Sequence, residues 1–231
     1  MSGHDGFLLL LGSPKKEPST SESLGAYLLE ALGNRQLRTE TLDVHRTLKR
    51  QDGPETLIDA VSRAGTLILA APLYVDSLPS RVIRGMEILE EHRVRTGTPW
   101  GRQMTAIVNC GFPEALHTRT ALDICRCFAR KAGFEWLGGL GLGGGEAIAG
   151  RRLSELGGMV RNVRKSLDLT VEALSKERTI PEKAVTLMAK SLMPSWIYTI
   201  IGSMHWKRLA KGNGVKKRLN ARPLLEESTG S

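Results

Sequence analysis

Residues that build metal sites and disulfide frameworks are scarce in this sequence. Its three cysteines, Cys110, Cys125 and Cys127, are an odd number, and none has the two-residue spacing typical of zinc and redox pairs. The five histidines are scattered without paired ligand spacing. We therefore expect structural thiols, no metal or iron–sulfur site, and a reducing compartment, the cytoplasm.

Long apolar runs and export signals are also missing. The first apolar run, 7–11, is far shorter than a membrane-spanning helix. Acidic Asp5 and no basic flank precede it, which is not the pattern of a secretory signal. The sequence has no Walker lysine, HExxH or GxSxG motif, so NTPase chemistry and the common hydrolytic chemistries lack the residues they need.

Acidic residues are scarce in one part of the chain only. Residues 1–150 carry 17 Lys and Arg against 17 Asp and Glu, whereas residues 151–231 carry 16 against 7. The net charge of +9 therefore belongs entirely to the C-terminal third. We expect no nucleic-acid partner, and the basic segment needs an explanation of its own.

What the sequence does contain is a regular alternation of strand and helix patterns. The expected strands are 7–11, 37–44, 66–71, 104–109 and 134–140, and the expected helices are 21–32, 54–64, 80–92, 114–132, 153–174 and 181–192. This alternation is typical of an α/β fold, a parallel sheet with helices on both faces. We divide the chain into a domain at 1–178 and a basic helical extension at 179–231.

The first strand end has the composition of a phosphate site. Lysines and small hydroxyl residues surround the expected start of a helix: Ser13, Lys15, Lys16, Ser19, Thr20, Ser21 and Ser23. Unpaired backbone N–H groups, the helix dipole, hydroxyls and a lysine all favour a dianionic phosphate. The alternative is that Ser21 only caps the helix and the rest is a solvated loop.

Two more loops leave strand ends, and in such sheets ligands lie beyond these ends. The loop 72–79 offers stiff, apolar surface from Pro72, Leu73, Tyr74, Val75, Leu78 and Pro79. The loop 109–113 offers Asn109 and the backbone of Cys110 and Gly111 to the polar edge of a ring. A phosphate site beside an apolar slot suggests a nucleotide-like ring system. The alternative is that Pro72 only ends a strand and Tyr74 is a rim aromatic.

One glycine pattern is misleading. Gly139, Gly141 and Gly144 match the dinucleotide-binding fingerprint by letter, but only helices are expected after them. The required strand-helix-strand unit is missing. We interpret the segment as a tight turn, with 143–146 passing near the bound ring system.

In their order along the chain, the three loops resemble those of the flavodoxin-like NADPH-dependent FMN reductases and related NAD(P)H-dependent oxidoreductases. Residues 12–21 are similar to the loop that holds the FMN phosphate, 72–79 to the isoalloxazine loop and 109–114 to the third loop. The resemblance covers about residues 7–175. It implies a five-stranded parallel sheet in the order 2-1-3-4-5. It also implies that FMN is held by Ser13, Lys15, Ser19, Thr20, Ser21, Pro72, Leu73, Tyr74, Val75, Asp76, Leu78, Asn109, Cys110, Gly111 and Phe112.

The function implied by the resemblance is that of an FMN-dependent NAD(P)H oxidoreductase. Electrons would pass from NADPH or NADH through the flavin to a small-molecule acceptor, without a catalytic side chain. A homodimer is implied as well. Two alternatives stay open: an FMN-binding electron carrier, and a flavin-free interaction module of the same fold.

The C-terminal extension combines an apolar stripe with a basic end. Trp196, Ile200 and Met204 share one side of an expected helix, and cations follow at Lys207, Arg208, Lys211, Lys216, Lys217 and Arg218. Small residues within the stripe allow close helix packing, so we expect it to dock on the core or on a second subunit. The alternative is peripheral contact with an anionic membrane through 193–218.

Overall fold

The first of two compact units contains the whole sheet. The computed structural model describes residues 6–192, 206–216, 219 and 221, and the chain divides into units at 1–192 and 193–231. The strands are β1 (Gly6–Leu11), β2 (Arg38–Asp43), β3 (Thr66–Pro72), β4 (Gln103–Asn109) and β5 (Glu135–Leu142). All neighbours pair in parallel, in the order β2-β1-β3-β4-β5. The predicted flavodoxin-like α/β fold is therefore confirmed.

The helices follow the predicted alternation, with three differences, one of which is that only 119–132 of the helix predicted at 114–132 is α-helical. They are α1 (Thr20–Gly33), α2 (Val44–Thr47), α3 (Gly53–Arg63), α4 (Ser80–Thr96), α5 (Arg119–Ala132), α6 (Arg161–Leu174) and α7 (Glu182–Met188), with 3-10 turns η1 (Ala115–Thr118), η2 (Gly145–Ala147) and η3 (Leu153–Val160). The single helix predicted at 153–174 is broken, because Gly157 takes φ 55° and ψ −135° ahead of α6. The short α2 was not predicted, since one turn carries no apolar periodicity.

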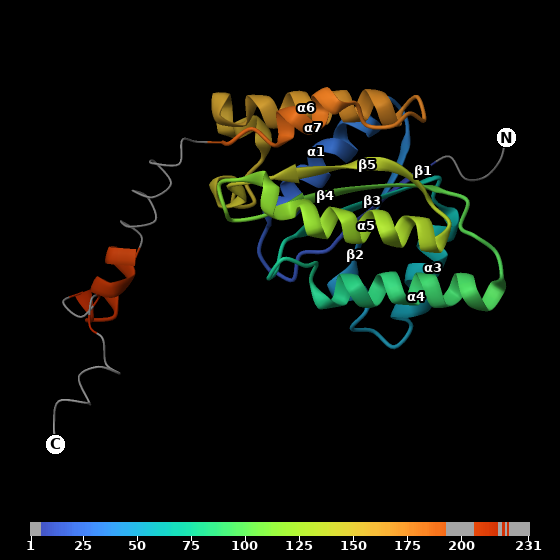
Figure 1. The fold of residues 1–231 in the computed structure, drawn as a ribbon, viewed down its shortest axis with the longest axis horizontal. Helices are drawn as coiled ribbons and strands as arrows, with labels where there is room; N and C mark the ends of the chain where they lie inside the picture. Colours follow the sequence, from blue (N-terminus) through green and yellow to red (C-terminus); the bar gives the residue numbers. More distant parts are fainter. Residues whose placement is uncertain (1–5, 193–205, 217–218, 220, 222–231) are drawn as a thin grey trace, which may run out of the picture. The chain divides into compact units, whose positions relative to one another are not determined.

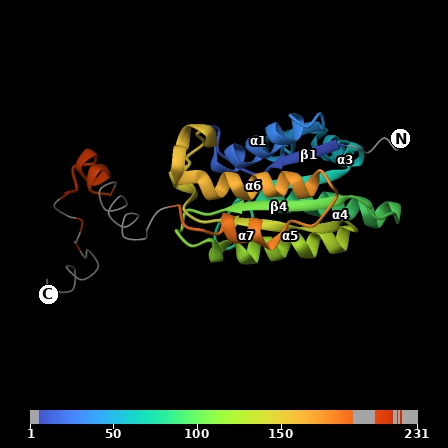
Figure 2. The same cartoon turned by 90° about the horizontal axis from the view of Figure 1, so that it is seen from above.

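The sheet is covered on both faces, as Figures 1 and 2 show: α1, α6 and α7 lie on one side, and α3, α4 and α5 on the other. Successive residues of β1 serve the two sides alternately. Leu8 and Leu10 belong to the cluster under α3–α5, and Phe7 and Leu9 to the cluster under α1, α6 and α7. Burial on both faces explains why the strands appear in the sequence as continuous apolar runs.

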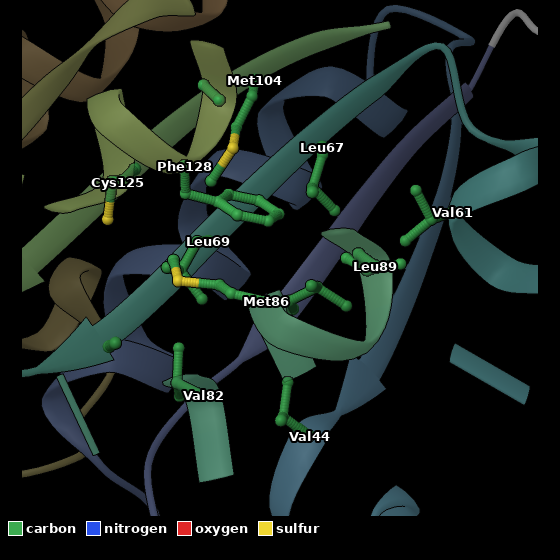
Figure 3. Close-up of a cluster of buried hydrophobic side chains, with 14 of the residues drawn as sticks. Val44, Val61, Leu67, Leu69, Val82, Met86, Leu89, Met104, Cys125 and Phe128 are labelled. Atoms are coloured by element: carbon green, nitrogen blue, oxygen red, sulfur yellow. The ribbon is translucent and has the colours of Figure 1, made fainter. Parts of the chain in front are cut away.

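The cluster under α3–α5 holds the helices that lie beside the carboxyl ends of the strands. Figure 3 shows Val44 from α2 and Val82 and Met86 from α4 directed into the same group of side chains as Leu69 from β3. Val44 and Val82 are each about 2% exposed. The α2 turn and the first turn of α4 therefore pack against the same hydrophobic cluster.

Helix α7 belongs to the first unit, whereas the sequence analysis placed it in the extension. Ile180, Ala184 and Met188 are buried in the cluster under α1 and α6. The Ile180 N–H also donates to the Leu137 carbonyl of β5 at 2.7 Å. The compact unit accordingly ends at Leu192 rather than at residue 178.

The second unit is described in part. Residues 206–212 form a short helix on which Lys207, Arg208 and Lys211 are exposed. The predicted apolar stripe at Trp196, Ile200 and Met204 lies outside the described residues. Over the described ranges, no helix combines the length and apolarity that crossing a membrane requires.

Candidate functional site

Strand register brings the predicted loops to one edge of the sheet. Pro72 at the end of β3 is paired with Asn109 at the end of β4, which is paired with Leu142 at the end of β5. The Leu73 N–H then donates to the Asn109 carbonyl at 2.8 Å. The second and third loops are thus joined directly, as expected for parallel strands that end together.

The first loop leads into a helix N-terminus with free donors. Ser19 caps α1, and its Oγ accepts the N–H of Glu22 at 3.3 Å. The N–H groups of Thr20 and Ser21 lie in the first turn, where no intrahelical acceptor exists, and they donate to no other group in the described part of the chain. Together with the helix dipole, they suit an anion.

Lysine charge is available beside this helix end. Lys15 and Lys16 are exposed in the loop, and the Lys15 Nζ lies 3.9 Å from the Glu146 carboxylate. Both members of that pair are more than half exposed, so the pair is weak and Lys15 can turn to another anion. The Ser13 hydroxyl lies in the same loop and accepts a long hydrogen bond, 3.4 Å, from the Lys15 N–H.

Two of the predicted phosphate ligands face the protein instead. The Thr20 hydroxyl donates to the Gly145 carbonyl at 2.7 Å, and the Ser21 hydroxyl donates to Asn109 Oδ1 at 2.7 Å. Thr20 and Ser21 are both buried. Because each hydroxyl has one proton, these two side chains tie α1 to the ends of β4 and β5 and have no proton left to donate to a ligand.

Asn109 holds an unused donor at the meeting point of the loops. Its side chain is 8% exposed, and its Oδ1 accepts from Ser21. The other end of the amide, Nδ2, makes no hydrogen bond to any described residue and lies where a Cβ on Gly145 would approach to 3.1 Å. This amide N–H₂ group can therefore donate to an acceptor on a bound ligand.

The second loop turns tightly and presents an apolar tip. Tyr74 and Ser77 exchange backbone hydrogen bonds of 2.8 and 3.0 Å. Between them, Val75 and Asp76 have φ 47° and 60°, the left-handed region of a type I′ turn. A β-branched residue is disfavoured there. Val75 is nevertheless 98% exposed, so no packing compensates its strain, which points to a functional reason for this side chain.

The remaining apolar residues of that loop divide between surface and core. Tyr74 is 43% exposed. Leu78 is buried in the cluster under α3–α5, and Leu73 packs partly against it. Tyr74 and Val75 are therefore the side chains of this loop that offer apolar surface to a ligand.

The third loop offers an exposed aromatic ring. Phe112 is 56% exposed, and its ring is tilted against His117 with 4.5 Å between centroids. Cys110 is buried, and its Sγ lies 3.5 Å from the Phe112 carbonyl. Burial raises the pKa of the Cys110 thiol above its ordinary value, the Phe112 backbone acts against this and the Glu114 carboxylate adds to it, so the group remains protonated at neutral pH.

A fourth segment, 143–146, lies at the same edge of the sheet. The Gly145 N–H donates to the Cys110 carbonyl at 2.8 Å, and Gly145 accepts the Thr20 hydroxyl. A Cβ on Gly143 would lie 2.2 Å from the Pro113 carbonyl oxygen. Only glycine permits this approach of the β5 end to the third loop. Among the described residues, no His, Cys, Asp and Glu side chains gather into a metal-binding group.

Comparison with known proteins finds the same fold at low sequence identity. No protein-family model and no curated protein sequence matches the chain. An FMN-dependent NADH-azoreductase from Bacillus anthracis str. Ames Ancestor, solved in complex with FMN, superposes with a TM-score of 0.52 at 13% identity, covering 74% of this chain and 99% of that chain. An NADH:FMN oxidoreductase in its apo form gives 0.54 at 16% identity, covering 82% and 96%.

A third solved structure agrees. The NAD(P)H:quinone oxidoreductase from Methanothermobacter marburgensis gives a TM-score of 0.51 at 15% identity, covering 72% of this chain and 96% of that chain. At identities this low, the superpositions show that the chain shares the flavodoxin-like fold, and they show the fold alone.

Proposed function

We propose that the chain binds FMN at the carboxyl ends of its strands and oxidises a nicotinamide dinucleotide, passing the electrons to a small-molecule acceptor. One observation carries this proposal: two groups of free hydrogen-bond donors lie at the same edge of the sheet. They are the backbone N–H groups at the N-terminus of α1 and the side-chain amide N–H₂ of Asn109. The fold supports it, because doubly wound sheets bind their ligands at this edge. The three compared structures, all of oxidoreductases, support it as well.

The donor set fits the phosphate end of FMN. A phosphomonoester needs several hydrogen-bond donors and positive charge. The first turn of α1 provides two free N–H groups, Ser13 and Ser19 provide hydroxyls, and Lys15 provides charge. Thr20 and Ser21 act as positioning residues, because their hydroxyls hold this helix end against the third and fourth loops.

The other loops fit a flat ring with a polar edge. Tyr74, Val75 and Phe112 expose apolar surface on two loops that are hydrogen-bonded to each other. Asn109 Nδ2 supplies a donor between them. When bound, FMN supplies the hydride and electron chemistry. Fixed donors at the ring's polar edge favour the negative charge that develops there on reduction, without rearrangement of the protein.

No side chain at this edge has to act as an acid or a base. The Cys110 thiol is buried and protonated, and its contacts are backbone carbonyls. The task of the protein is to bind, to orient and to exclude water from one face of the ring. We therefore assign no catalytic residue.

A visible spectrum of the purified full chain, with mass analysis of any released ligand, tests the cofactor. NADH or NADPH oxidation by the FMN-loaded protein, with a quinone as acceptor, tests the reaction. We expect a yellow protein that turns over. Protein that neither carries nor takes up FMN would contradict the proposal, and tight FMN binding without turnover would favour an electron carrier.

We also propose a homodimer and a cytoplasmic protein, in which the C-terminal extension contributes to assembly. Sedimentation of the full chain and of a chain ending at Leu192 tests this. We expect the full chain to sediment as a dimer and the shorter chain as a monomer. If it assembles equally well but loses binding to anionic vesicles that the full chain shows, the extension is a membrane contact instead.

A further inference from the structure

A second group of cations lies beside the first loop, on the side of β2. Leu11 of β1 is paired with Asp43 of β2, so the α2 turn that follows Asp43 starts next to Gly12. His45 in this turn lies against the Gly12 backbone. Its Nε2 is sealed from solvent and has no hydrogen-bond partner within the described ranges.

Arg81 joins this turn to α4. It is the second residue of that helix, and its Nη1 donates to the Leu48 carbonyl at 3.0 Å across 33 residues of sequence. The flanking Val44 and Val82 are buried in one cluster (Figure 3), so both attachment points are rigid. The rest of the guanidinium fork makes no hydrogen bond within the described part of the chain and remains available for an anion.

The charge of this group is not compensated. Arg46, Arg50 and Arg84, on the same elements, each pair with a carboxylate. Within the described residues, neither Arg81 nor Lys49 has a carboxylate within the 4.0 Å of an ion pair. Arg81 is hydrogen-bonded to the carbonyl of Leu48, the residue before Lys49, at the border of the first loop. Both cations act electrostatically on His45, as does the Asp43 carboxylate.

A guanidinium with free fork donors and a nearby ammonium bind a phosphomonoester best. The phosphate of FMN is already served by the α1 N-terminus. In the nicotinamide donor, the phosphomonoester is the 2′-phosphate of NADPH, which NADH lacks. We infer that Arg81, with Lys49, forms a 2′-phosphate subsite and makes the chain select NADPH over NADH; this rests on the proposed nicotinamide donor.

The test uses binding of nucleotide fragments, so that it does not depend on flavin or turnover. Calorimetry on the full chain compares adenosine 2′,5′-bisphosphate with 5′-AMP. We expect the bisphosphate to bind more tightly, and Arg81→Gln to weaken it by about tenfold or more while changing 5′-AMP binding much less. Arg84→Gln is the matched control, because Arg84 lies one turn along α4 and is paired with Glu87 and Glu91.

Each outcome separates the two proposals. Equal binding of the two nucleotides, or no loss in folded Arg81→Gln protein, would overturn the subsite whatever the flavin result. A loss of FMN affinity in Arg81→Gln, with bisphosphate binding unchanged, would reassign Arg81 to the flavin phosphate and also overturn it. A colourless, inactive chain whose bisphosphate binding still depends on Arg81 would support the subsite and contradict the flavin reaction. Thermal unfolding verifies that the variant is folded, and Arg81→Lys, which keeps charge but not the fork, should lose part of the affinity.

Discussion

Individual side chains at the strand ends have divided roles that composition alone does not reveal. Thr20 and Ser21 were predicted as phosphate ligands because they lie in a hydroxyl-rich helix start, yet their protons go to acceptors 125 and 88 residues away. Sequence patterns describe residues that are close to one another along the chain. The acceptor of a buried hydroxyl depends on which distant backbone the fold brings to it, so this part of the site was beyond prediction.

Ser21→Ala should destabilise the protein by about 1–3 kcal/mol, because it leaves the buried Asn109 Oδ1 without its donor. Denaturant unfolding measures the change. Ser23→Ala is the matched control in the same helix. The Ser23 hydroxyl donates to the Ser19 carbonyl, which also accepts the Ser23 N–H, so that carbonyl keeps a hydrogen bond in the variant. The unfolding free energy should therefore change by no more than about 0.5 kcal/mol. Equal losses in the two variants would mean that the Ser21–Asn109 bond contributes nothing specific.

Ser13→Asp should weaken FMN binding by about tenfold or more, because it replaces a donor with like charge beside a dianion. Ser13 is a cleaner position than Ser21, where a carboxylate would be buried and would threaten the fold. Ser62→Asp adds the same charge at an exposed position on α3 and should leave affinity unchanged. Fluorescence titration with FMN measures both. Matched affinities would place the phosphate elsewhere.

The imidazole of His45 should make stability depend on pH. Burial lowers the pKa of His45, helped by Arg81 and Lys49 and opposed by the Gly12 carbonyl and Asp43. The unfolded chain therefore binds this proton more readily than the folded one, so stability is complete above the ordinary histidine pKa of about 6.5 and falls as pH drops below it. We expect the unfolding free energy of His45→Gln to decline less between about pH 7.5 and 5 than that of the natural chain. Parallel declines would exclude this role.

At the scale of elements, all five strands fall within two residues of their predicted ends at each terminus. Burial on both faces leaves uninterrupted apolar runs in strands such as β1 and β3, and β2 was found from its alternating pattern. The starts of α1, α3, α4 and α7 were placed within one residue, whereas the helix predicted from residue 114 becomes α-helical only at Arg119. The break at Gly157 was not, since a glycine inside an amphipathic stretch is compatible with a continuous helix. The type I′ turn was missed for a related reason. Val75 and Asp76 are not the asparagine and glycine that signal such turns.

Val75→Gly should stabilise the protein by up to about 1 kcal/mol, because relief of left-handed strain outweighs the added freedom of the unfolded chain. The same change at Val94, exposed within helical α4, should destabilise it by about 1 kcal/mol. Denaturation midpoints measure this contrast. If the strain serves flavin binding, Val75→Gly should also lose FMN affinity. A destabilised Val75→Gly variant would mean that the turn is not strained.

For the whole molecule, the boundary of the folded unit decides which part of the chain can stand alone. The sequence pattern suggested an end near residue 178, just after the last expected helix of the core at 153–174. Packing sets it later, because Ile180 donates its N–H to Leu137 of β5 and α7 is buried in the cluster under α1 and α6. The Ser166 hydroxyl donates to the Ala184 carbonyl at 2.6 Å, and both residues are fully buried. The element that looked like extension is therefore part of the core.

Two truncations should behave differently for this reason. A chain ending at Leu192 keeps every described core residue of the first unit and should unfold cooperatively, close to the full chain in midpoint. A chain ending at Arg178 loses Ile180 and Met188, whose burial contributes about 2–5 kcal/mol each, and leaves the Ser166 hydroxyl unpaired. That sum approaches the whole stability of a typical domain, about 5–15 kcal/mol, so the shorter chain should be largely unfolded. Circular dichroism during heating compares the two. A cooperative transition in the shorter chain at the same midpoint would show that α7 is dispensable and that the sequence-based boundary was adequate.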